Sequence, residues 1–455
     1  MKTPFPDARS VAAAVLNELE TGRQTLDGIM EKNMSAAAMP DRRERALVTT
    51  LVYGVLRHRN ALDWLIAELS RTPFQRIEPG IRNTLRLALF QIYYLDRIPD
   101  YAAVNAAVTM AGRTGHPRLK GFVNGVLRAA IRNREQVAWP DVRQEDLAPL
   151  AVALSLPEWL LQRWVDRYGR KMTETMGRAL NTIPPVTVRA NLLKTTPARA
   201  RESLSGEVSR LQEGRYAPGA FSFYSPRVPV DELDAFRQGW IQVQDEAAQL
   251  VCRYFDPRPQ ETILDACAGR GGKTAHIAQL MENRGKIYAV DRNPGKLAVL
   301  EGEMKRLGVR NVTAAAADLL QDDHLPGPAR YDRIFADCPC SGLGVLRRNP
   351  DTRWSVTPTD IERHRGLQVR LLDRLAPRVR PGGLLLYAVC SREPEENEQV
   401  IEAFLNLHPE FGINRKHGLL GGAAEDLVDE KGCFASAVYP HDLDGFFGVR
   451  LQKKS

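Results

Sequence analysis

Apolar residues recur at helical spacing through the first 140 residues of the chain. Val11, Val15 and Leu19 fall on one face, and Leu47, Leu51 and Val55 do so further on. Further helices are predicted over 61–69, 81–95 and 102–112, and an amphipathic helix over 118–134. Prolines separate these segments, and no strand-like alternation interrupts them. The pattern predicts an all-α domain over residues 1–140, followed by a linker at 138–149.

The pattern changes between residues 150 and 242. A helix is predicted over 156–169, a proline-bounded strand over 184–194, a capped helix from Thr196 with Pro197 in its first turn, and a short strand over 219–224. This mixture predicts a small α+β domain over 150–242. Four Arg or Lys stand between Arg189 and Arg201. The domain could extend a nucleic-acid-binding surface or serve only as a linker.

Short apolar segments alternate with helical ones from residue 243 to residue 455. Strands are predicted over 262–269, 286–291, 311–318, 331–338 and 383–390, and helices over 273–281 and 294–308. This alternation predicts an α/β, Rossmann-like domain built on a parallel sheet. The carboxyl ends of its strands hold the unusual residues: Asp265 to Lys273, Asp291, Asp318, Asp337 and Cys390. Ligands of such sheets bind at that edge, so these residues form the candidate site.

Length and composition support several globular domains. The chain has 455 residues, of which 44% are hydrophobic and 26% charged, and two or three domains are expected. The N-terminus lacks the apolar core of a secretion signal, and no apolar run is long enough for a bilayer. We therefore expect a cytoplasmic protein whose six cysteines stay reduced.

The positive charge is concentrated at the start of the chain. The net charge is +8, and residues 1–135 hold 20 Lys and Arg but only 13 Asp and Glu. Such a surface could bind phosphates, or it could simply be solvated.

The glycine turn after the first strand of the last domain limits the choice of ligand. A phosphate-binding P-loop would need Gly where Cys267 stands, and a dinucleotide fingerprint would need Gly at Thr274. NAD therefore stays only as the weaker alternative. Asp291 suits the two hydroxyls of a ribose, and Asp318 could accept from an adenine amino group. S-adenosylmethionine fits these requirements, since its sulfonium tolerates nearby carboxylates.

Three cysteines share the same edge of the predicted sheet with Cys267. Cys338 and Cys340 stand in the segment Asp337–Gly342, and Cys390 follows the next strand. A zinc site from these four lacks paired C-x-x-C spacing, so no metal is expected. Cys252, Cys267 and Cys338 are interpreted as small core residues, and Cys433 belongs to no motif.

The motifs together resemble a known family. In order they are DACAGRGGKT, AVDRNPGKL, ADLLQ, FADCPCSGLGVLRRNPDTRW, YAVCSREPEENEQV and DGFF, with VQDEAAQLV before them. They resemble those of bacterial RNA cytosine-5 methyltransferases. The helical segment DRRERALVTTLVYGVLRHRNALDWLI resembles a NusB-like RNA-binding domain, which is fused to the methyltransferase in small-subunit rRNA enzymes of the Fmu/Sun type. The resemblance covers essentially the whole chain.

The resemblance implies an activity and a set of roles. It implies a NusB-like domain at 1–140, a small RNA-binding subdomain at 150–242 and a class I methyltransferase domain at 243–455. It implies methyl transfer from S-adenosylmethionine to carbon 5 of a cytosine in RNA, with cytosine 967 of 16S rRNA as the target. It implies Cys390 as the nucleophile, Cys340 as the group that helps release the product, Asp337 as the residue that holds the base and Lys273 as an orienting residue. The cofactor would be bound by Cys267, Ala268, Gly269, Arg270, Gly271, Gly272, Lys273, Asp291, Asp318 and Asp337.

Two alternatives remain beside this interpretation. They are a tRNA cytosine-5 methyltransferase and a non-catalytic RNA-binding factor of the antitermination type, and the cysteine pair disfavours the second. The implied partner is RNA, neither DNA nor a membrane, and a monomer is expected.

Several local expectations accompany the resemblance. The family usually reads Ala-Pro-Gly-Gly-Lys where this chain has Gly269–Lys273, and loss of the proline should loosen the loop. A helix predicted to start near Pro394 would lower the pKa of the Cys390 thiol. Asp265 is expected to brace the glycine loop. Arg347, Arg348 and Arg353 are expected to contact phosphates or to form a solvated patch, and Trp354 to be either a core residue or a stacking platform.

Overall fold

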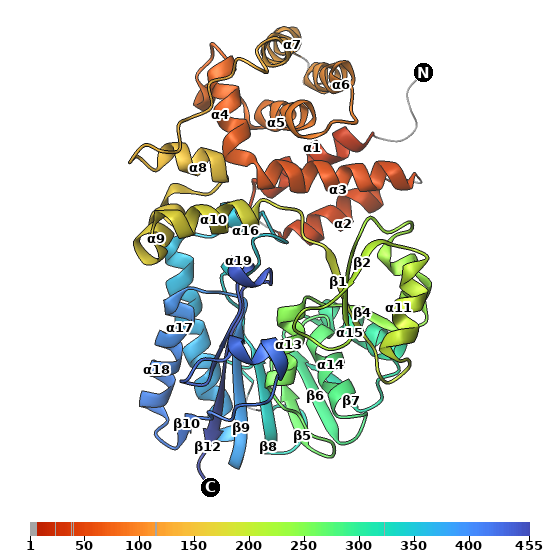
Figure 1. Ribbon diagram of the computed structural model, residues 1–455, viewed down its shortest axis with the longest axis vertical. Helices are drawn as coiled ribbons and strands as arrows, with labels where there is room; N and C mark the ends of the chain where they lie inside the picture. The colour runs from red at the N-terminus through yellow and green to blue at the C-terminus, as the bar shows by residue number, and fades with distance from the viewer. Residues whose placement is uncertain (1–6, 23, 38, 40, 114–115, 323) are drawn as a thin grey trace. The chain divides into compact units, whose positions relative to one another are not determined.

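The computed structural model describes residues 7–455 except 23, 38, 40, 114–115 and 323. Contacts divide the chain into two units (Figure 1). The first, here called the helical unit, comprises Met1–Thr182 and Asn349–Ser355. The second, here called the sheet unit, comprises Ile183–Arg348 and Val356–Ser455. The helical unit is therefore completed by a short segment from much later in the chain.

The described part of the helical unit contains helices and no strand. The α-helices are α1 (Ala8–Leu19), α2 (Leu26–Ala36), α3 (Arg42–Arg57), α4 (Arg59–Leu69), α5 (Pro79–Tyr94), α6 (Asp100–Gly112), α7 (Pro117–Arg132), α8 (Ala148–Leu154), α9 (Glu158–Tyr168), α10 (Arg170–Leu180) and α16 (Thr352–Ser355). A 3-10 turn, η1, covers Phe74–Arg76. The all-helical prediction is confirmed. Residues 138–147 are irregular, and the helices α8 to α10 that follow them belong to the same unit as α1 to α7.

The predicted apolar faces of these helices form one core. Val11, Val15 and Leu51 are each at most 4% exposed, and α5 lies at the centre of the cluster. Helices α3 and α5 approach closely at Gly54, where an added Cβ would meet the ring of Phe90. None of the helices in the described residues combines the length and apolar character that a bilayer crossing requires.

The sheet unit begins with a small antiparallel sheet of order β2-β3-β1-β4. Its elements are β1 (Val186–Ala190), α11 (Pro197–Ser205), β2 (Ser209–Glu213), β3 (Ala220–Tyr224), η2 (Val230–Glu232), α12 (Asp234–Arg237) and β4 (Ile241–Val243). The Thr196 hydroxyl accepts from the N–H of Arg199, so α11 starts at Pro197 as predicted. The predicted α+β character is confirmed.

The large sheet follows, with the order β10-β12-β9-β8-β5-β6-β7 and β11 paired to β12. Its strands are β5 (Thr262–Asp265), β6 (Lys286–Asp291), β7 (Val312–Ala316), β8 (Tyr331–Asp337), β9 (Val379–Val389), β10 (Phe411–Ile413), β11 (Cys433–Ala435) and β12 (Phe447–Lys453). Strands β5 to β9 are parallel, as predicted. The sheet extends beyond the predicted strands, because β12 runs antiparallel to β9 and pairs with β10 and β11.

Helices cover both faces of the large sheet. The helices of this part of the chain are α13 (Glu246–Tyr254), α14 (Gly272–Leu280), α15 (Pro294–Leu307), α17 (Pro358–Leu375), α18 (Glu398–Leu407) and the short α19 (Val438–His441), which has no buried residue, and the 3-10 turns are η3 (Leu343–Val345), η4 (Ala376–Arg378), η5 (Pro394–Glu396) and η6 (Gly422–Leu427). Neighbouring residues of β5 point to opposite faces: Ile263 joins the core under α13 and α14, and Leu264 joins the core that includes α17 and α18. The Rossmann-like class is therefore present, with an antiparallel extension.

Candidate active site

The strand order gathers the predicted site residues along one edge of the large sheet. Asp337 ends β8 and pairs in register with Ala388 of β9, two residues before Cys390. On the other side of β8 lies β5, followed by β6 and β7. The order in which successive strands are added reverses between β5 and β8, which are parallel, and sheets of this kind bind ligands at such a switch point. The cysteine loops thus follow β8 and β9, and the glycine loop and the remaining carboxylates follow β5, β6 and β7.

The two cysteines of the expected reaction are in contact. The Sγ atoms of Cys340 and Cys390 are 3.3 Å apart, and both side chains are half-buried. The bond to Cys390, together with burial, raises the pKa of the Cys340 thiol well above its usual range. Cys340 is therefore the thiol of the pair that keeps its proton, and it can donate that proton toward the Cys390 sulfur. The helix predicted to start near Pro394 is wrong, because only the 3-10 turn η5 begins there and α18 starts at Glu398.

Lys273 and Asp337 form an ion pair at the same edge. The Lys273 Nζ donates to Asp337 Oδ2 at 2.6 Å and lies 5.1 Å from the ring centroid of Phe446. Burial acts to lower the pKa of Lys273, but the Asp337 carboxylate acts more strongly and leaves that pKa above its ordinary value. Lys273 is therefore not a merely solvated side chain. A permanent positive charge stands beside Asp337 and close enough to Cys390 for an electrostatic interaction.

A buried carboxylate joins the two cysteine loops, and the sequence analysis missed it. Glu396 is 0% exposed, and its Oε1 accepts from the Ser341 N–H at 2.7 Å and from Gln368 Nε2 at 3.2 Å. Its Oε2 accepts from the Ser341 hydroxyl at 2.5 Å, and that hydroxyl lies 3.3 Å from the hydroxyl of Ser391. Glu396 therefore fixes the residue after Cys340 against the residue after Cys390. In the sequence Glu396 stands in an acidic run, which is typical of a solvated surface. Its spacing of three residues from Glu393, just before α18, is the one local signal that could have marked it as a candidate.

The glycine loop is held by carboxylates at the ends of two strands. Gly269 and Gly271 have φ values of +56° and +84°, which favour glycine, and an added Cβ at Gly271 would meet Leu300 and Met304. The Gly269 N–H donates to Asp291 Oδ2 at 3.0 Å. The hydroxyl of Thr274, in the first turn of α14, donates to Asp265 Oδ2 at 2.6 Å. These bonds order the loop although the family's proline is absent, and Asp265 braces it as expected.

The edge beyond this loop suits a nucleoside. Cys267, Ala268, Gly269 and Gly272 are half-buried, Gly271 is buried and Arg270 is exposed. Asp291 and Asp318 are also half-buried, and the end of β7 lies beside the end of β6. Carboxylates in these positions can accept from hydroxyl or amino donors, and S-adenosylmethionine has both. Nowhere in the described chain do three His, Cys, Asp or Glu side chains meet in a geometry suited to a metal ion.

The cysteines outside the pair have different surroundings. Cys252 and Cys338 are at most 4% exposed, which confirms them as core residues. Cys267 is half-buried and packs at the border of the same core as Cys338. Cys433 is half-buried in β11.

Arg347 and Arg348 do not serve the roles predicted for them. Arg348 donates to Asp245 Oδ2 at 2.7 Å and to Asp444 Oδ2 at 3.0 Å, and Arg347 pairs with Asp442. Both predictions, phosphate contact and a solvated patch, are wrong, because these carboxylates occupy the two guanidinium groups inside the sheet unit.

Arg353 and Trp354 belong to the helical unit. Arg353 is 1% exposed and donates to the carbonyls of Arg57, Ser155 and Leu180. The indole of Trp354 donates to the Leu56 carbonyl at 2.8 Å and packs against the helical core. Arg353 is thus neither a phosphate ligand nor a solvated residue, and Trp354 is a core residue.

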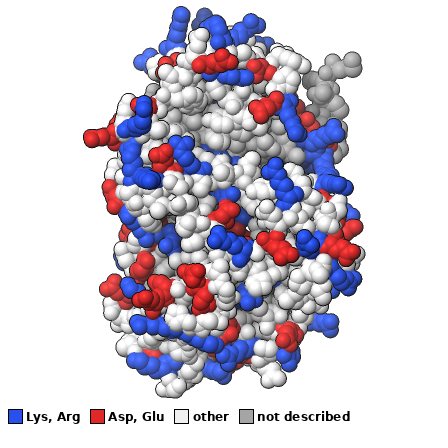
Figure 2. Space-filling model, viewed as in Figure 1, with Lys and Arg blue, Asp and Glu red and all other residues white. Residues whose placement is uncertain are grey.

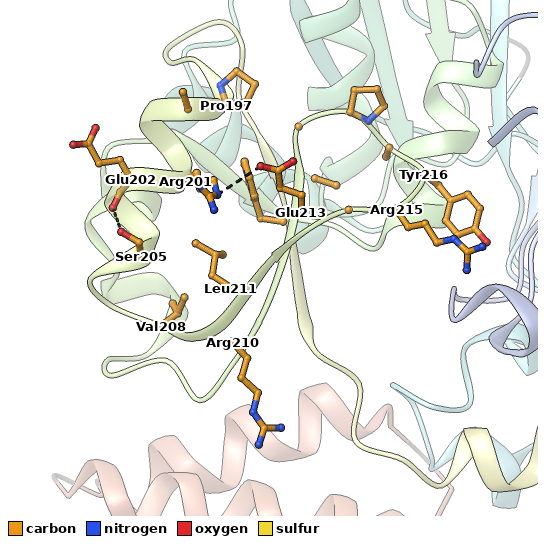
Figure 3. A pocket seen from close by; sticks show the side chains of 17 residues that line it. Pro197, Arg201, Glu202, Ser205, Val208, Arg210, Leu211, Glu213, Arg215 and Tyr216 are labelled. Carbon is orange, nitrogen blue, oxygen red and sulfur yellow. Dashed lines mark hydrogen bonds and ion pairs between the residues drawn. The ribbon is translucent and has the colours of Figure 1, made fainter. Parts of the chain in front are cut away.

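A separate depression of about 930 Å³ lies on the small sheet. It is lined by α11, β2 and the loop 214–219, and the Arg201 and Glu213 side chains pair across it at 3.6 Å (Figure 3). Arg215 and Tyr216 lie side by side at one end of this loop and point away from that pair (Figure 3).

The charges of the helical unit are spread rather than gathered on the side seen in Figure 2. Lys and Arg side chains there are separated by uncharged surface and by Asp and Glu. Basic residues of α7 are nevertheless exposed, among them Arg118, Lys120, Arg128 and Arg132.

Comparisons with known proteins agree along the whole chain. Residues 252–452 match the family described as 16S rRNA methyltransferase RsmB/F, residues 6–132 match the NusB family, and residues 156–231 match the ferredoxin-like domain of RsmF/B-like methyltransferases. The "Probable ribosomal RNA small subunit methyltransferase B" of Bacillus subtilis is 36% identical and that of Synechocystis is 35% identical, each over 98% of this chain and 98–99% of the relative. The crystal structure of PH0851 covers 100% of both chains with a TM-score of 0.80 and 26% identity.

Proposed function

Because the chain belongs to the RsmB/F family of 16S rRNA methyltransferases, we propose that it methylates carbon 5 of a cytosine in 16S rRNA through a covalent bond to Cys390. The family makes it an S-adenosylmethionine-dependent RNA methyltransferase. The target we propose is cytosine 967, in the cytoplasm, where ribosomal subunits are assembled. The observation that carries the proposal is the contact of two thiols from adjacent strand ends, 3.3 Å apart.

Two sulfurs suit this chemistry because carbon 5 of cytosine is a weak nucleophile. When the Cys390 thiolate bonds to carbon 6, the electrons of the 5,6 double bond move to carbon 5, which can then take a methyl group. Restoring the double bond requires loss of the proton from carbon 5 and departure of the Cys390 thiolate from carbon 6. Cys340, next to Cys390, is placed to accept that proton.

The coupling of the two thiols supports this division of roles. While Cys390 is free, the Cys340 proton is shared toward it and stabilises the Cys390 thiolate. Once Cys390 is bonded to carbon, its sulfur bears no negative charge, and the main cause of the raised Cys340 pKa disappears. Cys340 then ionises more easily and releases its own proton to solvent, so that its thiolate can accept the proton from carbon 5.

Asp337 and Lys273 would orient the base. Lys273 occupies Asp337 Oδ2, so Asp337 Oδ1 can accept from the amino group on carbon 4 of the cytosine. The positive charge of Lys273 also interacts electrostatically with nearby Cys390. Neither residue changes its bonding during the reaction, so both act as positioning groups.

The cofactor would lie over β5, β6 and β7. S-adenosylmethionine supplies the methyl group when bound. Asp291 would accept from the ribose hydroxyls while it holds Gly269, and Asp318 would accept from the adenine amino group. The segment Cys267–Lys273 would face the rest of the molecule, with its glycines allowing close approach.

A denaturing gel with labelled RNA tests the proposal. Cys390→Ala should form no covalent RNA complex and no 5-methylcytosine. Cys340→Ser should accumulate a complex that survives denaturation, since elimination stalls. Cys338→Ala is the matched control and should behave as the wild type, because that side chain lies in the core. A trapped band in Cys390→Ala, or in the Cys340/Cys390 double variant, would contradict the assigned roles, and bisulfite sequencing of rRNA and tRNA from a strain lacking the protein identifies the target.

A further inference from the structure

An aromatic and cationic cluster lies beside the cysteine loops within the sheet unit. It comprises Arg215 and Tyr216 from the loop 214–219, Tyr439 and His441 from α19, and Arg392, two residues after Cys390. We propose that this cluster, here called the flanking-nucleotide site, stacks and neutralises the RNA nucleotides next to the target cytosine. The inference rests on the proposed function, because it names how the same active site would recognise its RNA.

The segment that bears His441 is fastened to the backbone of the nucleophile. The N–H of Gly344 donates to the Cys390 carbonyl at 3.0 Å, and the N–H of Gly445 donates to the Gly344 carbonyl at 2.7 Å. An added Cβ at Gly344 would fall 2.8 Å from the Cys390 carbonyl oxygen, so only glycine allows this approach. An added Cβ at Gly445 would lie 3.2 Å from Cγ of Arg392. These backbone contacts therefore hold the segment that bears His441 close to Cys390.

The loop that bears Tyr216 is held just as firmly. The Glu246 carboxylate, from the first turn of α13, accepts from the backbone N–H groups of Arg215, Tyr216 and Ala217. The Ala217 bond is 2.7 Å long. Three bonds to one buried carboxylate order this loop before any ligand binds, which reduces the entropy lost on binding.

The side chains meet in a geometry suited to bases and phosphates. The rings of Tyr216 and His441 are 6.4 Å apart at 86°, and the Arg215 guanidinium lies 5.1 Å from the Tyr216 ring centroid. Tyr439 is 41% exposed, and Tyr216 and His441 are half-buried. Burial, then Arg392 and Arg215, lower the pKa of His441. His441 is therefore a neutral ring at physiological pH, flanked by two permanent cations.

The reaction creates a need for such a site. A base must leave its stack before a thiol can reach carbon 6, and its neighbours lose a stacking partner when it does. Proteins that bind single-stranded RNA replace that partner with aromatic rings and guanidinium planes. The flanking-nucleotide site provides both groups beside the cysteines, so it can stabilise the opened RNA.

The test measures binding and turnover of full-length Tyr216→Leu, Tyr216→Phe and Arg215→Gln. Oligonucleotides of the target sequence have 2-aminopurine on either side of the cytosine, and its fluorescence is quenched when it stacks. We expect Tyr216→Leu to raise the KM for RNA by about tenfold or more and to lose the quenching, with the KM for S-adenosylmethionine unchanged. Tyr216→Phe should retain both properties, and Arg215→Gln should weaken RNA binding and reduce its salt dependence.

Tyr224→Leu is the matched control, because Arg210 lies 5.8 Å from the Tyr224 ring in an equivalent pair on β2 and β3. It should leave the KM for RNA and the quenching as in the wild type. Wild-type KM and quenching in Tyr216→Leu would overturn the inference, as would an equal effect of Tyr224→Leu. The quenching does not depend on methyl transfer, so it tests the flanking-nucleotide site by itself. If the wild type forms no 5-methylcytosine, that result refutes the proposed function and not this inference.

Discussion

Replacing Glu396 by Gln should disturb the position of Cys340 while it leaves both reacting cysteines in place. The carboxylate accepts from the Ser341 N–H, the Ser341 hydroxyl and Gln368 while it is fully buried. A glutamine keeps the volume and one acceptor oxygen but places an NH₂ group where the second oxygen stood. The serine hydroxyl can rotate and accept from that group, whereas the backbone N–H of Ser341 can only donate.

The expected magnitude follows from the charge that is lost. A hydrogen bond to a charged group contributes about 1.5–3 kcal/mol and one between neutral groups about 0.5–1.5 kcal/mol, so the two bonds to Ser341 together lose about 1.5–3 kcal/mol. If that energy holds Cys340 against Cys390, its loss corresponds to roughly 10- to 150-fold in rate. The slowed step should be elimination, because Cys340 neighbours Ser341, so the covalent RNA complex should accumulate.

Single-turnover methylation and the denaturing gel measure both effects. Glu398→Gln is the matched control, since it removes the same charge from an exposed position two residues away. Ser341→Ala is a second variant that removes the hydroxyl and keeps the N–H, and it should show a smaller effect of the same kind. If Glu396→Gln lowers the unfolding temperature but leaves the rate and the trapped fraction unchanged, Glu396 supports the fold only and does not position Cys340.

Three further predictions concern the cofactor, the pH dependence of stability and RNA affinity. Asp291→Ala should weaken S-adenosylmethionine binding about tenfold or more, because a charged hydrogen-bond partner is lost; unchanged affinity in calorimetry would contradict the ribose assignment. Burial raises the pKa of Asp265 to about 7, above its unfolded value, so between about pH 4 and pH 7 the folded state binds more protons and stability falls as pH rises, by up to about 1.4 kcal/mol per unit. Asp265→Asn should flatten that slope in urea midpoints, and an unaltered slope would refute the assignment. Arg128→Glu with Arg132→Glu on α7 should weaken rRNA binding and reduce the salt slope by about 0.7–0.9 per lost contact, whereas Arg178→Glu on α10 should not; equal effects would indicate a general charge effect only.

Local patterns predicted the strands and the order of the site residues well. The runs ending at Asp265, Asp291 and Asp337 are apolar because both faces of those strands are covered, and a parallel sheet brings their ends to one edge. Strand β12 was missed because its sequence, FGVRLQK, is half polar and gives no sign of its antiparallel partner.

Residues whose partners are distant in the sequence could not be predicted. Glu396 accepts from Ser341 and Gln368, 55 and 28 residues away, and Arg353 donates to carbonyls as much as 296 residues away. Glu396 and Arg353 are charged residues within polar segments, and such a pattern predicts a solvated surface. Only the folded chain shows that these charges are buried and bonded.

The segment Asn349–Ser355 has a consequence for synthesis of the protein. The helical unit is nearly complete when residue 182 has been made, but its buried arginine and tryptophan arrive only after the whole cysteine loop 337–348. At about 5–20 residues per second, a ribosome needs roughly 10 to 35 s for the intervening stretch. During that time the carbonyls of Arg57, Ser155 and Leu180 lack the hydrogen bonds that the Arg353 guanidinium later donates to them. A nascent chain released before residue 355 would thus lack a native helical unit, and it would also lack β9 and Cys390, so the helical unit is completed before the catalytic centre.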